Sequence, residues 1–198
     1  IQNSFALFDF PLDDAWIHQT YARNLAEAGE WAFLPGQPSA GSTAPGWTLL
    51  LAMGHWLKLG PYAWTYLLGW VLLWGTAMAG ANGWSALAPR LPGWKAWAGI
   101  LLALEWHLAW SAGSGMETLL MTLIALVVLA RLTRLEAGGK SAAADGRVDC
   151  GTWLGSGALV GLSAWVRPDG VTLLGSLGMA ALLGRRPWAD KMRIAIYS

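Results

Sequence analysis

The chain has 198 residues, of which 55% are hydrophobic and only 13% are charged, and its mean hydropathy is +0.41. A soluble domain usually carries about a quarter charged residues. This composition, with 15 Trp and 25 Gly, favours a polytopic membrane protein, in which Trp lies at headgroup level and Gly allows helices to approach closely. The net charge of +1 argues against a nucleic-acid partner.

The densest polar segment comes first, as "PLDDAWIHQTYARNLA" at 11–26. It predicts an amphipathic helix over 14–29 that opens with the adjacent carboxylates Asp13 and Asp14. Capping of the helix N-terminus explains one of these aspartates well. A general base, with or without a divalent metal such as Mg²⁺ or Mn²⁺, is the other interpretation, because adjacent carboxylates repel unless a cation is shared. The sequence leaves both open.

The rest of this N-terminal region combines polar side chains with a loop and a short apolar run. His18 and Tyr21 are candidate pocket residues, whereas Arg23 fits a solvated helix face. Residues 33–47 are rich in Pro, Gly and Ser and predict either a mobile substrate loop or a plain connector. The run at 47–59 is too short to cross a membrane comfortably, so it predicts a second interfacial helix.

Five further apolar runs predict transmembrane helices, because a hydrocarbon core of ~30 Å requires about 20 apolar residues. They cover 62–88, 93–113, 116–132, 151–166 and 170–184. Basic residues cluster after the first, third and fifth runs, and the positive-inside rule places these ends in the cytoplasm. We therefore expect an extracytoplasmic loop (1–61) and a transmembrane bundle (62–198), the chain being a fragment truncated at both ends.

This orientation places polar residues from three separate connections on the extracytoplasmic face. They are Asp13, Asp14, Glu117, Arg167 and Asp169. Glu117 also fits simple capping of the helix that it opens. Arg167 beside Asp169 fits either a local ion pair or a site for a lipid phosphate, since guanidinium binds phosphate in a bidentate manner. The sequence therefore predicts one cavity mouth that is surrounded by acids and one arginine.

Two ionisable residues, Glu105 and His107, lie in the middle of the second predicted span, 93–113. An ionisable pair inside a span indicates a functional site by default. The alternative is that the two side chains pair with each other or with another helix of the bundle.

The chain resembles a known family in three stretches that occur in the family's order and spacing. They are "LDDAWIHQTYARNLAEAGEWAFLPGQPSAGSTAPGWTLLLA" (12–52), "SGMETLLMTLIALVVLAR" (114–131) and "WVRPDG" (165–170). They resemble membrane glycosyltransferases of the GT-C fold, above all the group that contains mycobacterial terminal arabinofuranosyltransferases. The chain departs from the family's pattern at Gly46, where a bulky residue is usual.

The resemblance implies an all-α polytopic membrane protein with a GT-C-like helical bundle in the bacterial cytoplasmic membrane. It also implies transfer of a sugar, with inversion, from a polyprenyl-phosphate donor to a glycan, lipid or protein acceptor on the extracytoplasmic face. Asp13 or Asp14 would be the general base or hold a divalent metal, and a metal or Arg167 would stabilise the leaving phosphate. The candidate substrate-binding residues are His18, Tyr21, Glu117, Arg167 and Asp169. A non-catalytic transporter, flippase or accessory subunit of a larger membrane complex is the competing hypothesis.

Overall fold

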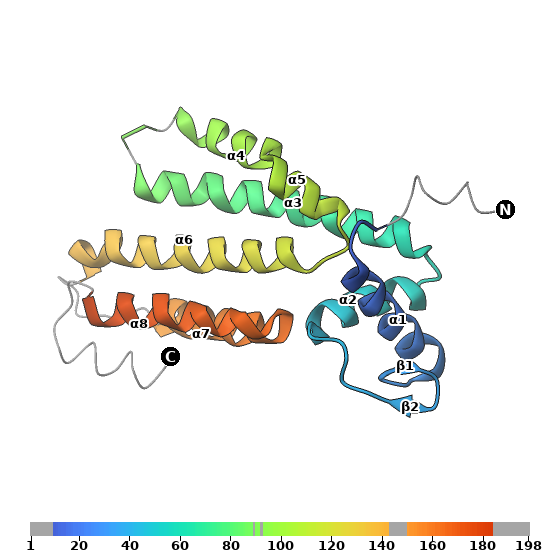
Figure 1. The fold of residues 1–198 in the computed structure, drawn as a ribbon. Coiled ribbons are helices and arrows are strands. Elements are labelled where there is room, and N and C mark those ends of the chain that lie inside the picture. Colours follow the sequence, from blue (N-terminus) through green and yellow to red (C-terminus); the bar gives the residue numbers. More distant parts are fainter. Residues whose placement is uncertain (1–9, 89, 92, 143–149, 184–198) are drawn as a thin grey trace.

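The computed structural model describes residues 10–88, 90–91, 93–142 and 150–183, and these ranges are mostly helical (Figure 1). The helices are α1 (Asp13–Ala28), α2 (Pro45–Trp56), α3 (Pro61–Leu87), α4 (Trp94–Leu104), α5 (Trp106–Gly113), α6 (Thr118–Ala142), α7 (Cys150–Val166) and α8 (Leu173–Leu183). A 3₁₀ helix, η1 (Pro168–Thr172), joins α7 to α8. The all-α class predicted from the sequence is confirmed. The outer ends of the predicted ranges, 1–9 and 184–198, lie outside the described residues.

The helices form a bundle with a smaller layer of structure at one of its ends. Figure 1 shows α3, α6, α7 and α8 running side by side, with α4 lying along α3. At one end of this bundle α1 and α2 pack against each other, and α2 also contacts α3 and α7. Connections at this end of the bundle can therefore meet the first two helices.

Local sequence signals account for several helix boundaries. Pro45 and Pro61 stand at the first positions of α2 and α3, where the missing N–H of proline has no intrahelical role and its fixed φ suits a helix. Gly29 ends α1 with a φ of 70°, in the left-handed region that glycine adopts without strain.

The prediction of one continuous helix over 93–113 was wrong, because the chain breaks at Glu105. The backbone of Glu105 is extended (φ −64°, ψ 124°), and its carboxylate accepts hydrogen bonds from the Leu108 N–H at 2.9 Å and from His107 Nδ1 at 2.7 Å. Glu105 is therefore the N-cap of α5, and capping favours a new helix start over continuation. The interpretation in which Glu105 and His107 pair with each other holds.

The region predicted as a loop, 33–47, contains a small antiparallel hairpin. Its strands are β1 (Ala32–Leu34) and β2 (Gln37–Pro38), and the turn between them includes Gly36 at a φ of 77°. Asn24 on α1 donates its amide to the carbonyl oxygens of Ala32, at 2.9 Å, and Phe33, at 3.1 Å. The hairpin is thus bound to α1 by side-chain hydrogen bonds that sequence periodicity does not reveal.

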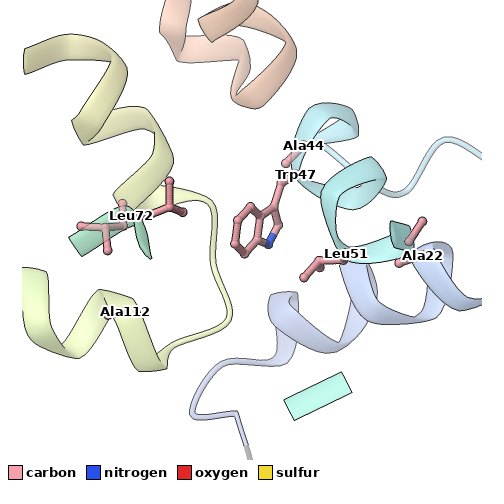
Figure 2. Packing of buried hydrophobic residues seen from close by; sticks show 8 residues of the cluster. Ala22, Ala44, Trp47, Leu51, Leu72 and Ala112 are labelled. Atoms are coloured by element: carbon pink, nitrogen blue, oxygen red, sulfur yellow. The ribbon is translucent and has the colours of Figure 1, made fainter. Parts of the chain in front are cut away.

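One hydrophobic core joins the first two helices to the bundle. Figure 2 shows the indole of Trp47 among residues of several elements, including Leu51 on α2, Leu72 on α3 and Ala112 on α5. Trp47 is 1% exposed, and its indole N–H donates to the carbonyl oxygen of Gly115 at 2.9 Å. This core crosses the boundary predicted between 1–61 and 62–198, so the two parts pack as a unit.

A second core lies among α6, α7 and α8. Its buried members are Ile124, Val128, Leu132, Trp153, Val160, Val166 and Leu177. This core holds α7 against α6. The connection that follows α7 is thereby positioned at the end of the bundle where α1 and α2 lie.

The outer surface of the bundle is apolar over much of its length. Trp70 is 76% exposed and Leu104 is 75% exposed, and other large exposed side chains lie on α3, α4, α5, α7 and α8. They include Leu67, Val71, Trp74, Trp94, Trp97, Leu101, Trp106, Leu154, Leu162, Trp165 and Met179. In the described ranges, no helix combines the length and the apolar character that are needed to cross a membrane. The described parts of the five predicted spans are mostly helical, with the break at Glu105 in the second, and they stay a prediction as spans.

Candidate functional site

Asp13 and Asp14 are the first two residues of α1, and both are exposed. The N-cap position is occupied by Leu12, and no side chain makes a capping hydrogen bond there. Capping as an explanation for either aspartate was therefore wrong, because both lie one position or more inside the helix. Their charges still lie close to the positive end of the helix dipole, which favours carboxylates.

The two aspartates lie on different faces of α1. Successive residues of an α-helix are separated by about 100° around its axis, whereas residues four apart share a face. Asp14 therefore lies on the face of His18, and its charge acts on the His18 ring. Asp13 lies on the neighbouring face. The structure thus distinguishes two residues that the sequence could not separate.

Glu117 joins His18 to Arg167 at the end of the bundle. Its Oε2 lies 3.5 Å from His18 Nε2, and its Oε1 lies 3.3 Å from Arg167 Nη1. Arg167 Nε also donates to Asp169 Oδ1 at 3.0 Å. Residues from α1, from the start of α6 and from the α7–η1 connection are therefore brought together. We call His18, Glu117 and Arg167 the site triad.

Solvent exposure increases along the site triad from His18 to Arg167. The side chains of His18 and Glu117 are 3% and 4% exposed, whereas that of Arg167 is 36% exposed. Burying a carboxylate is costly unless it is paired, and Arg167 supplies the pairing charge. The carboxylate of Glu117 is thus used in ion pairing. Arg167 pairs locally with Asp169, as one interpretation of the sequence held, and reaches Glu117 as well.

The imidazole of His18 is kept neutral by its surroundings. Burial lowers the pKa of His18 below its usual 6.5, because the charged ring would lose its hydration. Glu117 and Asp14 oppose this change in pKa because their negative charges favour the protonated ring, and Arg167 adds to it. Burial is the largest of these effects, so the surroundings favour the neutral ring.

Tyr21, predicted as a pocket residue, instead anchors the connection that follows the hairpin. It is 1% exposed, and its hydroxyl lies 2.6 Å from Ser39 Oγ and accepts the Gly41 N–H at 2.8 Å. Hydrogen bonds of this kind hold the connection against α1. The interpretation of this segment as a mobile loop is therefore not favoured. Among the described residues, no hydrogen bond joins Tyr21 to the site triad.

Two further residues of the site, Ser42 and Thr48, were missed from the sequence. Both are buried, and both hydroxyl oxygens lie near His18 Nδ1, at 3.1 Å and 3.4 Å. The only signal for Thr48 is a hydroxyl residue in an otherwise apolar helix, and Ser42 lies in a stretch where serine is typical of loops. Neither pattern indicates a site by itself.

The described residues do not by themselves complete the Mg²⁺ or Mn²⁺ site predicted at Asp13 and Asp14. Hard divalent cations take about six oxygen ligands, and neighbouring helix positions direct their carboxylates apart. Among the described residues, no group of three or more His, Cys, Asp or Glu side chains could hold a metal ion. The metal stays a prediction, and no chemical step below is assigned to it.

The assembled groups combine a solvent-exposed carboxylate, a neutral imidazole and a partly exposed guanidinium. A carboxylate of this kind can take a proton from a hydroxyl, and a guanidinium can bind the oxygens of a phosphate. Comparison of the chain with protein-family models, curated proteins and solved structures finds no match.

Proposed function

We propose that the chain belongs to an integral-membrane glycosyltransferase that moves a sugar from a polyprenyl-phosphate donor to an extracytoplasmic acceptor with inversion. The observation that carries the proposal is that Glu117 contacts both His18 and Arg167 at one end of the bundle. Asp14 lies one turn before His18 on the same face of α1. These residues come from the same three stretches on which the resemblance to GT-C glycosyltransferases rests.

The position of the site supports a lipid-linked donor. The bundle exposes large apolar side chains such as Trp70, Trp74 and Leu104, and an extended apolar surface marks contact with a membrane or a partner. Tryptophan is also the residue enriched at membrane interfaces. A donor with its tail in the bilayer would present its phosphate at the end of the bundle, where Arg167 lies.

Asp14 is the residue that we assign as the general base. The acceptor hydroxyl transfers its proton to the Asp14 carboxylate as its oxygen attacks the anomeric carbon. The bond between that carbon and the phosphate oxygen breaks, and the phosphate leaves with the electron pair. This places the incoming oxygen opposite the leaving phosphate, which accounts for inversion. A positioned base typically contributes about a hundredfold to ten-thousandfold in rate.

Arg167 is the residue that we assign to the departing phosphate. Its guanidinium has five N–H donors, and the contacts with Glu117 and Asp169 direct two of its nitrogens. The other donors can bind phosphate oxygens on the exposed side of the guanidinium. The charge that accumulates on the phosphate in the transition state is stabilised by a cation fixed in advance.

The experiment replaces Asp14 by Asn in the purified full-length protein and measures sugar transfer from a polyprenyl-phosphate sugar. We expect the rate constant for transfer to fall about a hundredfold or more, since Asn cannot accept the proton. Glu27→Gln, on an exposed position of the same helix, is the matched control and should transfer at the unmodified rate.

Other results would change the assignment in different ways. A larger loss in Asp13→Asn than in Asp14→Asn would move the base to Asp13. Undiminished transfer in both variants would remove both aspartates from the chemistry. Absence of transfer by the unmodified protein from every polyprenyl-phosphate sugar tested would favour the transporter, flippase or accessory-subunit hypothesis.

A further inference from the structure

The hydroxyls of Ser42 and Thr48 form a short polar cluster behind His18. Ser42 Oγ lies 3.1 Å from His18 Nδ1 and 2.8 Å from Thr48 Oγ1, and Thr48 Oγ1 lies 3.4 Å from the same ring nitrogen. Thr48 is 0% exposed and Ser42 is 9% exposed. Buried hydroxyls of this kind are normally hydrogen-bonded, so their contacts fix the orientation of the ring that they meet.

Glu117 determines which ring nitrogen of His18 carries the proton. His18 Nε2 faces Glu117 Oε2 at 3.5 Å, while the other oxygen of Glu117 pairs with Arg167. A bare nitrogen facing a carboxylate oxygen would place two acceptors against each other. This contact favours the neutral form of the ring with its proton on Nε2, which leaves Nδ1 as an acceptor for a donor.

The two hydroxyls supply that donor in one consistent direction. With Nδ1 as an acceptor, Ser42 can donate its hydroxyl hydrogen to His18 Nδ1 and accept the hydroxyl hydrogen of Thr48. His18 Nε2–H then points at Glu117. The result is a pair of hydrogen bonds that begins on α2 at Thr48, passes through Ser42 and ends at His18. The other ring nitrogen then faces the carboxylate that holds Arg167, at a contact distance of 3.5 Å.

A serine, a histidine and an acid in this order also occur in nucleophilic catalysis. In that chemistry the serine oxygen must meet an incoming substrate atom. Ser42 is buried and its oxygen is shared with Thr48, so the geometry fits positioning of His18 and not attack on a substrate.

We propose that Ser42 and Thr48 are positioning residues of this site: they hold His18 with Nε2–H toward Glu117 and so keep the other Glu117 oxygen on Arg167. The effect on sugar transfer rests on the proposed function, whereas the effect on His18 does not. The double variant Ser42→Ala/Thr48→Val removes both hydroxyls with little change in volume. Thr20→Val is the matched control, because within the described part of the chain its hydroxyl bonds to the Trp16 carbonyl of the same helix and not to the site.

The first measurement is nitrogen NMR of the purified full-length protein labelled with ¹⁵N-histidine, with the His18 signals assigned by their loss in His18→Gln. In the unmodified protein and in Thr20→Val, we expect the neutral His18 ring to carry its proton on Nε2. In the double variant Nδ1 loses its donor, so the two neutral forms should mix and the pKa of His18 should rise. An unchanged His18 spectrum and pKa in the double variant would overturn the proposal.

The second measurement is sugar transfer by the same variants. We expect kcat/KM to fall about tenfold in the double variant, because misplacing a group that orients Arg167 weakens transition-state binding. The single variant Thr48→Ser, which keeps the hydroxyl, should show the same His18 spectrum and the same transfer rate as the unmodified protein. If the double variant does not fold, Ser42→Ala alone removes the nearer hydroxyl and gives the same two measurements.

The two proposals fail in distinguishable ways. An unmodified protein without transferase activity contradicts the proposed function, while the NMR measurement still decides whether Ser42 and Thr48 position His18. Normal transfer in the double variant, combined with a changed His18 spectrum, would overturn the coupling of His18 to Arg167 and leave the transferase proposal in place.

Discussion

The end of the molecule that contains α1 and α2 differs from the bundle in what it buries. It encloses polar side chains such as His18, Gln19 and Asn24, whereas the bundle exposes apolar ones such as Trp70 and Leu104. A buried polar group is costly without a hydrogen-bond partner, and His18, Gln19 and Asn24 each contact a specific atom. Gln19, for example, donates to Thr65 Oγ1 at 2.7 Å.

The difference separates two sources of structural specificity. In the first region, hydrogen bonds and ion pairs determine which side chains meet, and these bonds are short-range and directional. In the bundle, close packing at glycine and alanine positions determines how near the helices lie. We therefore expect substitutions to have different consequences in the two regions.

The largest expected effect concerns Trp47, where the two regions share a core (Figure 2). Trp47→Ala should lower the free energy of unfolding by about 4 kcal/mol, because it leaves a cavity and an unpaired Gly115 carbonyl. Chemical denaturation of the purified protein measures this loss. Trp97→Ala, at a position that is 57% exposed, should change it by less than about 1 kcal/mol. Equal losses in the two variants would contradict a shared core at Trp47.

A smaller effect is expected at Gly69, which lies where α3 meets α5. A methyl group at this position would overlap the carbonyl oxygen of Ala112, and relieving that contact requires the helices to move apart. Gly69→Ala should therefore lower the free energy of unfolding by about 2 kcal/mol, measured by the same denaturation. Gly113→Ala is the control, since an added methyl there has no neighbour within 4 Å. If Gly113→Ala lowered the free energy of unfolding as much as Gly69→Ala, close helix packing would not be the cause of the loss.

The smallest effect that we expect is a dependence of stability on pH that originates at His18. Its pKa in the folded protein lies below 6.5, so the unfolded chain binds a proton more readily. The stabilisation is therefore fully present above pH 6.5 and is lost as pH falls through the lowered pKa. Denaturation from about pH 8 to about pH 5 should show a shallower loss of stability in His18→Gln than in the unmodified protein. A steeper acid loss in His18→Gln would mean that the folded state favours the protonated ring.

Much of the secondary structure follows from the sequence, because it depends on local signals. Apolar runs predicted most helices within a few residues. Two local features were missed. The break at Glu105 depends on a carboxylate that caps α5, and the hairpin depends on bonds from Asn24. In both cases one polar side chain meets specific backbone groups, and such contacts leave no periodic pattern.

The candidate site was reached from the sequence only as a set of residues on one face. Charge distribution along the chain and the ordered resemblance indicated Asp14, His18, Glu117 and Arg167 without their contacts. The contacts depend on the packing of α7 against α6 and of α2 against α7, which brings residues far apart in the sequence within ion-pairing distance. The sequence by itself therefore determined which groups were available. The tertiary structure decided that His18 is buried against Glu117, that Tyr21 binds the connection, and that Ser42 and Thr48 belong to the site, because burial and long-range contacts exist only once the chain has packed.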